Sequence, residues 1–178
     1  MWQWWSTLDT TWRELVVSHL DLDGCFSEAD LSYLPAIEEL DCRGVALRDL
    51  TPLTRFSGLR GLNLSETPLT DLAALQHTPD LQQLDLSFGQ GYDLQQLHGL
   101  HQLSVLDLSY PLQRHLHPEA LAGLTSLREL YCNACGLDSL LFACQLPQLE
   151  VLAVPFNPLD SREIELFQAV NPICRLLF

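Results

Sequence analysis

The stretch from Leu59 to Leu108 repeats one six-residue motif three times, as LRGLNL at 59–64, LQQLDL at 81–86 and LSVLDL at 103–108. Leucine occupies the first, fourth and sixth positions of each copy, and the copies begin 22 residues apart. A fixed period of about 20 to 29 residues is typical of a solenoid, in which one structural unit stacks on the next. The spacing therefore predicts one short strand and one return segment in each period.

Less regular copies of this motif extend the pattern along nearly the whole chain. They bring the number of copies to eight and begin at Val17, Ile37, Leu127, Leu149 and, loosely, Ile173. At 178 residues the chain has the length of one domain. We therefore expect a single domain over 1–178, with an N-terminal helical cap at 1–16, repeats at 17–158, and a C-terminal helix and last strand at 159–178.

The repeats also share a longer pattern, L-x-x-L-x-L-x-x-N-x-L-x-D-L-x-x-L, which residues 59–75 match at most anchors. This pattern resembles the leucine-rich-repeat family and, in its period, the short Sds22-like subclass. The resemblance implies an α/β fold: a right-handed, curved solenoid with a concave parallel sheet of about seven or eight strands and short helical or 3-10 segments on the convex side. The family asparagine survives only as Asn157, with Thr67 and Cys135 among its replacements, so we expect less regular turns.

Both ends of the chain depart from the repeat. Trp5, Leu8, Trp12 and Leu15 recur at helical spacing, which predicts an amphipathic helix that covers the first repeat. The tryptophan-rich opening is similar to that of short bacterial repeat proteins, and an exposed aromatic docking surface is the alternative. At the other end, DSRE at 160–163 predicts a helix start and is followed by a hydrophobic edge strand at 173–178, a possible site of homo-oligomerisation.

The composition restricts the partner. The formal net charge is −14, and all nine basic residues are arginine. Without lysine the chain has no P-loop and no Schiff-base nucleophile, and no other catalytic motif is present, so we predict that it is not an enzyme. The acidity disfavours nucleic acid and anionic membranes, because phosphates would be repelled. A protein with a basic surface is the expected partner.

The six cysteines indicate a reducing compartment. Cys132 and Cys135 have the spacing of a redox or zinc motif, but both fall on template positions that face the interior. We therefore expect reduced cysteines and no metal or other cofactor. The opening residues lack the features of a signal peptide, and no stretch has the length of a membrane span. The predicted location is cytoplasmic.

Strand alternation predicts which side chains face the concave surface. With the fourth and sixth positions inward, the third, fifth and seventh positions should face outward. Together with aromatic residues at the later edge, these positions give the predicted protein-binding residues: Asp21, Asp41, Asn63, Asp85, Asp107 and Tyr131 at the fifth position, Glu39, Gln83 and Glu129 at the third, and Phe88, Tyr110 and Phe156 at the edge.

We interpret this acidic ladder as a surface for a basic protein, which would make the chain an adaptor, inhibitor or regulatory subunit. Adjacent aspartates oppose folding, because like charges on neighbouring strands repel each other. The plainer alternative is that L-D-L-S is simply a common sequence in this family. A different function, structural assembly through the terminal strand or the tryptophan-rich cap, also remains open.

Overall fold

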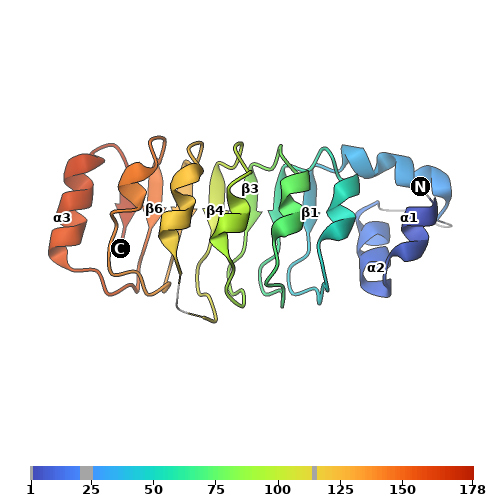
Figure 1. The fold of residues 1–178 in the computed structure, drawn as a ribbon, viewed down its shortest axis with the longest axis horizontal. Helices are drawn as coiled ribbons and strands as arrows, with labels where there is room; N and C mark the ends of the chain where they lie inside the picture. Colours follow the sequence, from blue (N-terminus) through green and yellow to red (C-terminus); the bar gives the residue numbers. More distant parts are fainter. Residues whose placement is uncertain (1, 21–25, 114–115) are drawn as a thin grey trace.

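The computed structural model describes residues 2–20, 26–113 and 116–178. Within these residues seven short strands form one parallel sheet, and their order in the sheet is their order in the chain (Figure 1). The strands are β1 Glu39–Asp41, β2 Gly61–Asn63, β3 Gln83–Asp85, β4 Val105–Asp107, β5 Glu129–Tyr131, β6 Val151–Ala153 and β7 Arg175–Leu177.

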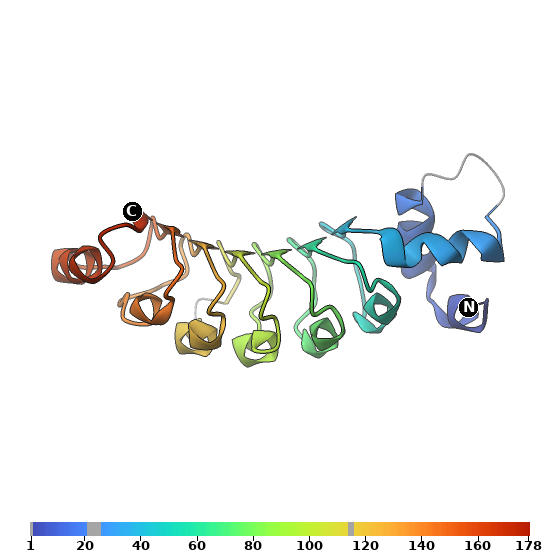
Figure 2. The ribbon, with the colours of Figure 1, turned by 90° about the horizontal axis from the view of Figure 1, so that it is seen from above.

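Short 3-10 helices return the chain from one strand to the next on the opposite side of the sheet. Figure 2 shows the strands along one side of the molecule and the 3-10 helices that follow β1 to β5 along the other; the first 3-10 helix precedes β1 at the N-terminal end. Leucines three residues apart suit the three-residue turn of this helix. The 3-10 helices are η1 Glu28–Ala36, η2 Thr51–Arg55, η3 Ala73–His77, η4 Leu94–Leu97, η5 Pro118–Gly123 and η6 Ala143–Gln145.

The register of the sheet stacks identical positions of the repeat. Leu62 pairs with Leu40 on one side and with Leu84 on the other. These fourth-position leucines are buried, while the strand residues on either side of them are more exposed. The leucines at the first and sixth positions, such as Leu59 and Leu64, are also buried. The predicted solenoid and its inward positions are therefore confirmed.

The first predicted strand, at 17–22, is wrong in its described part. Val17 and His19 lie in the second of two N-terminal α-helices, α1 Trp2–Thr7 and α2 Thr10–His19. Asp9 caps the start of α2, because its carboxylate accepts a hydrogen bond from Trp12 N–H. The helix then continues past the predicted boundary to His19. Val17 is exposed because the core-facing stripe of α2 runs through Trp12, Leu15 and Val16 instead.

The two helices cover the N-terminal end of the core. Trp12 is fully buried, and its indole N–H donates to the carbonyl of Asp49 at 3.0 Å. His19 contacts the outer edge of the sheet, where its Nε2 accepts the Asp41 backbone N–H of β1 at 3.1 Å. Unpaired strand edges invite pairing with other chains, and this N–H group of the edge is paired within the chain itself.

At the C-terminal end, helix α3 Ser161–Val170 precedes the last strand. The predicted helix start is confirmed: Asp160 accepts the backbone N–H groups of Arg162 and Glu163, both at 2.9 Å. The Glu163 carboxylate reaches the preceding repeat, where it accepts from Leu140 N–H at 3.0 Å. Within α3, Phe167 is buried, whereas Val170 is half exposed.

No helix in the described part of the chain is long and apolar enough to cross a membrane.

Candidate functional site: the concave groove and its rim

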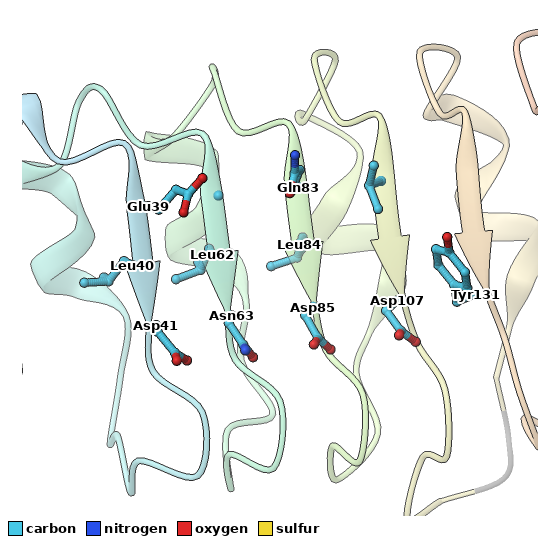
Figure 3. A pocket seen from close by; sticks show the side chains of 12 residues that line it. Glu39, Leu40, Asp41, Leu62, Asn63, Gln83, Leu84, Asp85, Asp107 and Tyr131 are labelled. Carbon is cyan, nitrogen blue, oxygen red and sulfur yellow. The ribbon is translucent and has the colours of Figure 1, made fainter. Parts of the chain in front are cut away.

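The concave surface contains a shallow groove of about 430 Å³ over the first five strands. Figure 3 shows four polar side chains of this groove at the same level on successive strands: Asp41, Asn63, Asp85 and Asp107. Glu39 and Gln83 line it at the third position of their repeats, and Tyr131 lies at the far end. Four of the lining residues are carboxylates and none is basic.

Each of these fifth-position side chains also has a structural task in its own repeat. The Oδ1 atom of Asp85 accepts the backbone N–H of Ser87 at 2.9 Å, and Asp107 accepts that of Ser109 at 2.8 Å. Asn63 makes the same bond to Ser65, and Asp41 makes it to Arg43. Such a bond to a backbone group two residues later stabilises a tight turn. It needs only one oxygen, so an amide serves as well as a carboxylate.

The charge of these residues is therefore not required by the turn. Because Asn63 fills the same position with the same geometry, replacing a neighbouring aspartate by asparagine should keep the turn intact. This also gives a physical reason for aspartate or asparagine at the fifth position, which the sequence alone left as a family habit. The extra negative charge at Asp41, Asp85 and Asp107 still needs its own explanation.

The pKa of the Asp107 carboxyl is raised above its usual value of 3.8. Burial is the main cause, and the charge of Asp85 on the neighbouring strand adds to it, against the lowering effect of the bonds from Ser109. The ionised form of Asp107 is therefore disfavoured mainly by burial, with a smaller contribution from repulsion by Asp85.

This shift gives a pH prediction. The folded protein holds the Asp107 proton more tightly than the unfolded chain, so this stabilising contribution is complete below pH 3.8 and is lost as the pH rises through the folded pKa. Asp107→Asn has no carboxyl group at this position, so it does not undergo this loss of stability as the pH rises. Relative to the parent protein, the variant should therefore be more stable, with a larger free energy of unfolding, near neutral pH than below pH 3.8, as measured by urea denaturation.

The effect should shrink in an Asp85→Asn background, because one cause of the shift is then removed. Other carboxyl groups titrate in both proteins and cancel in the difference. A parent-to-variant difference that stays the same across this pH range would contradict the assignment.

The far end of the groove is formed by a pair of polar side chains. The Tyr131 hydroxyl donates to the Glu129 carboxylate at 2.7 Å, and this bond is the main reason why the pKa of Tyr131 is raised. Glu129 does not line the groove itself, but it fixes the ring that does.

In three repeats the seventh position does not face the concave surface, contrary to our expectation, whereas Arg43 at this position of the β1 repeat is exposed. Ser65, Ser87 and Ser109 are buried, because the chain turns back immediately after the strand. The next residue of every repeat from β1 to β6 has a positive φ, and its N–H donates to a carbonyl one turn further along the solenoid where the next turn provides one. We call these eighth-position residues the rim column: Gly44, Glu66, Phe88, Tyr110, Ala134 and Phe156.

The predicted edge aromatics all belong to this column, at the ends of the strands and outside the groove lining. Phe88 and Tyr110 stack with ring centroids 5.1 Å apart and planes 11° apart. The following residues hold this pair in place: Leu112 N–H donates to the Gly89 carbonyl at 2.8 Å, which ties the two turns together.

The structure thus brings seven predicted residues into the groove, Asp41, Asn63, Asp85, Asp107, Tyr131, Glu39 and Gln83. It places Glu129 behind Tyr131 and sets Phe88, Tyr110 and Phe156 on the rim. Asp21 lies outside the described residues. The left-handed backbone of the rim column was not predicted from the sequence, because Gly44 is the only glycine among its members.

At the position of the family asparagine, Asn157 and the residues that replace it in other repeats make similar hydrogen bonds. Asn157 donates to the carbonyls of Cys132 and Val154, at 2.7 and 2.8 Å, and accepts the N–H of Leu137. In other repeats the Thr67 hydroxyl donates to the Leu64 carbonyl, and the Cys135 thiol to that of Leu108. The turns therefore stay regular, and the expected irregularity is not seen at these positions.

The described cysteines are free thiols and most are buried. Burial is the main cause that raises the pKa of Cys42 to about 12. Cys132 and Cys135 both lie in the core, where the C-x-x-C spacing follows from the repeat. Among the described residues no group of three or more His, Cys, Asp or Glu side chains is arranged to hold a metal ion. Cys25 lies outside those residues.

Comparisons with known proteins agree with this architecture. No family model and no curated protein matches the chain. Among solved structures, it is similar to a leucine-rich-repeat protein of Leptospira interrogans, with 25% identity and a TM-score of 0.69 over 86% of this chain and 40% of that one. An internalin, InlF, of Listeria monocytogenes has 21% identity and a TM-score of 0.70 over 88% of this chain and 46% of that one.

A third similar structure is TLR13 in a complex with ssRNA13, with 22% identity and a TM-score of 0.66 over 84% of this chain and 23% of that chain. This chain thus spans less than half the length of these three proteins. The parallel sheet, the repeat and these structures together define a leucine-rich-repeat solenoid. The chain therefore has the leucine-rich-repeat fold.

Proposed function

We propose that this protein is a recognition module, an adaptor, inhibitor or regulatory subunit that binds a basic protein on its concave groove. The observation that carries the proposal is the row of Asp41, Asp85 and Asp107, joined by Glu39, in a groove without basic side chains. The turn bonds of these aspartates could be made by asparagine, so their charge is available for a partner. Solenoids of this kind bind macromolecules on their extended concave surface.

The charge also favours protein over RNA. One similar structure, TLR13, is a complex with single-stranded RNA. A phosphate backbone needs basic side chains that release counterions, whereas this chain has a net charge of −14 and four carboxylates in its groove. A cationic surface is the complementary partner. We assign no catalytic step to the groove.

We further propose that the protein works in the cytoplasm. Five cysteines are described, all free, and four of them are buried as small apolar side chains. Such thiols persist where the environment is reducing.

A capture experiment tests the proposed function. The parent protein and an Asp85→Asn, Asp107→Asn double variant serve as parallel baits in a lysate of the source organism, and bound proteins are identified by mass spectrometry. We expect the parent to retain one or more proteins with basic surfaces that the double variant releases at moderate salt. Capture of the same proteins by both baits would count against the groove.

The matched control is Asp49→Asn, Asp71→Asn. These aspartates also lie in successive repeats, and each also accepts a backbone N–H two residues later, at 2.8 and 2.9 Å. They precede the 3-10 helices on the other side of the molecule. This variant changes the net charge by the same amount and should capture what the parent captures.

Self-association is the second candidate function. Ile173 and Phe178 occupy the first and sixth positions of the last repeat, yet 90% and 67% of their surfaces are exposed, whereas Leu149 and Val154 at these positions of the preceding repeat are buried. A second copy that pairs along β7 would cover them. Light scattering decides this: a mass that does not change with concentration and equals one chain would remove the candidate.

A further inference from the structure

The rim column contains one small residue between two large aromatic ones. Its last four members are Phe88, Tyr110, Ala134 and Phe156. Backbone hydrogen bonds place them in adjacent turns: Tyr110 N–H donates to Asn133 O at 2.8 Å, and Ala134 N–H to Pro155 O at 2.9 Å. Ala134 therefore takes the place of a ring among the last four members of the column, of which the other three are aromatic.

The spacing of the column shows how much room this leaves. Where two rings are consecutive, at Phe88 and Tyr110, their centroids are 5.1 Å apart and their planes nearly parallel. Each member thus fills about one strand spacing, roughly 4.8 Å. Tyr110 and Phe156 are two such steps apart along the column, and the residue between them, Ala134, carries only a methyl group.

The surface is hollow at this place. Ala134, Gly136, Phe156, Asn157 and Pro158 line an open crevice of about 510 Å³. Phe156 is 79% exposed, compared with 46% for Phe88 and 39% for Tyr110, which cover each other. A large apolar ring that is this exposed, on the wall of a crevice, is the kind of anchor that a partner buries.

The charge of the protein selects the kind of planar group. The chain carries −14 overall, and the exposed acids Asp138 and Asp160 follow two residues after crevice-lining Gly136 and Pro158. Guanidinium is planar, always cationic and stacks on aromatic faces, whereas the ammonium group of lysine is a compact, strongly hydrated charge. We propose that the space over Ala134, in the crevice walled by Phe156, is a slot for an arginine side chain of the partner, stacked on the Phe156 ring.

This slot deepens the proposed function, on which it rests in one respect: the arginine would belong to the basic partner of the groove. The slot itself lies on the rim, outside the groove lining. It can therefore be tested separately, with a small probe and without the partner.

The probe is N-acetyl-arginine amide, titrated into the full chain and followed by NMR at the Ala134 methyl group and the Phe156 ring. We expect both signals to shift saturably, with binding about fivefold or more tighter than for N-acetyl-lysine amide. The absence of saturable shifts at these two sites, or equal shifts with the lysine compound, would overturn the proposal.

Variants make the test specific. Ala134→Phe fills the slot and should weaken arginine binding roughly tenfold or more; its backbone has φ 56°, the same as Phe88, so the fold can accept the ring. Phe156→Ala removes one wall and should have a similar effect. Phe88→Ala changes the outer member of the stacked pair and should leave binding unchanged. Unaltered affinity in Ala134→Phe would also overturn the slot.

The Asp85→Asn, Asp107→Asn protein separates the two proposals. It should bind the arginine probe within roughly twofold of the parent, because its changed charges lie in the groove. If this variant no longer captures the partner but still binds the arginine probe, the groove is needed for the partner and the slot binds arginine without it. Loss of probe binding in this variant would mean that the groove, and not the slot, holds the arginine.

Discussion

Replacing Leu84 by alanine should lower the free energy of unfolding by about 2 to 5 kcal/mol. Leu84 is only 2% exposed and lies in the centre of β3, between Leu62 and Leu106 of the adjacent strands. The cost combines the lost burial of its side chain with the cavity left behind, which its close-packed neighbours fill only in part. A solenoid is stabilised mainly by contacts between neighbouring repeats, so the loss affects both interfaces of this repeat.

The control is one residue away. Gln83→Ala changes an exposed side chain on the concave face and should cost less than about 0.5 kcal/mol. Urea denaturation followed by circular dichroism measures both variants against the parent. Equal losses at the two positions would mean that the strand register described above is wrong.

Replacing Asn157 by alanine is expected to have the second largest effect, about 2 to 4 kcal/mol. Its amide donates to the carbonyls of Cys132 and Val154, and its oxygen accepts the N–H of Leu137. All three partners belong to buried residues. Truncation leaves these backbone groups unpaired, and an unpaired buried group loses its water without gaining a replacement bond.

Asn63→Ala is the matched control, because it also removes an asparagine that bonds to a turn. Its partners are the N–H and hydroxyl of Ser65 at the edge of the groove, and the expected cost is about 1 kcal/mol. The same denaturation experiment compares the two. If the Asn157 variant is no less stable than the Asn63 variant, the hydrogen bonds of Asn157 stabilise the fold no more than those of Asn63.

Much of the fold could be predicted because the sequence repeats the same leucine pattern several times. The leucines at the first, fourth and sixth positions recur at a fixed period, so an error at one copy is corrected by the others. The strand at 17–22 was wrong for the opposite reason. Val17 and Leu20 satisfy the strand motif, but α2 continues through Val17 to His19 with Trp12, Leu15 and Val16 on its buried face. The first of the eight copies also has only one neighbouring copy to fix its register.

The candidate groove was predictable from alternation along each strand, which places Asp85 and Asp107 outward whatever the details of the turn. The seventh position was not, because the chain leaves the strand before it reaches Ser87 or Ser109. The rim column depends on a left-handed backbone at residues such as Phe88 and Tyr110. Bulky residues seldom adopt this conformation, so nothing in their identity indicated it.

The central claim is that the charged row of the groove binds a basic partner. The most direct measurement is the dissociation constant of the captured partner, determined across a range of salt concentrations for the parent, for Asp85→Asn, Asp107→Asn and for the control Asp49→Asn, Asp71→Asn. We expect the groove variant to bind roughly tenfold more weakly at low salt and with a shallower salt dependence, while the control matches the parent. A groove variant that binds as tightly as the parent, with the same salt dependence, would contradict the claim.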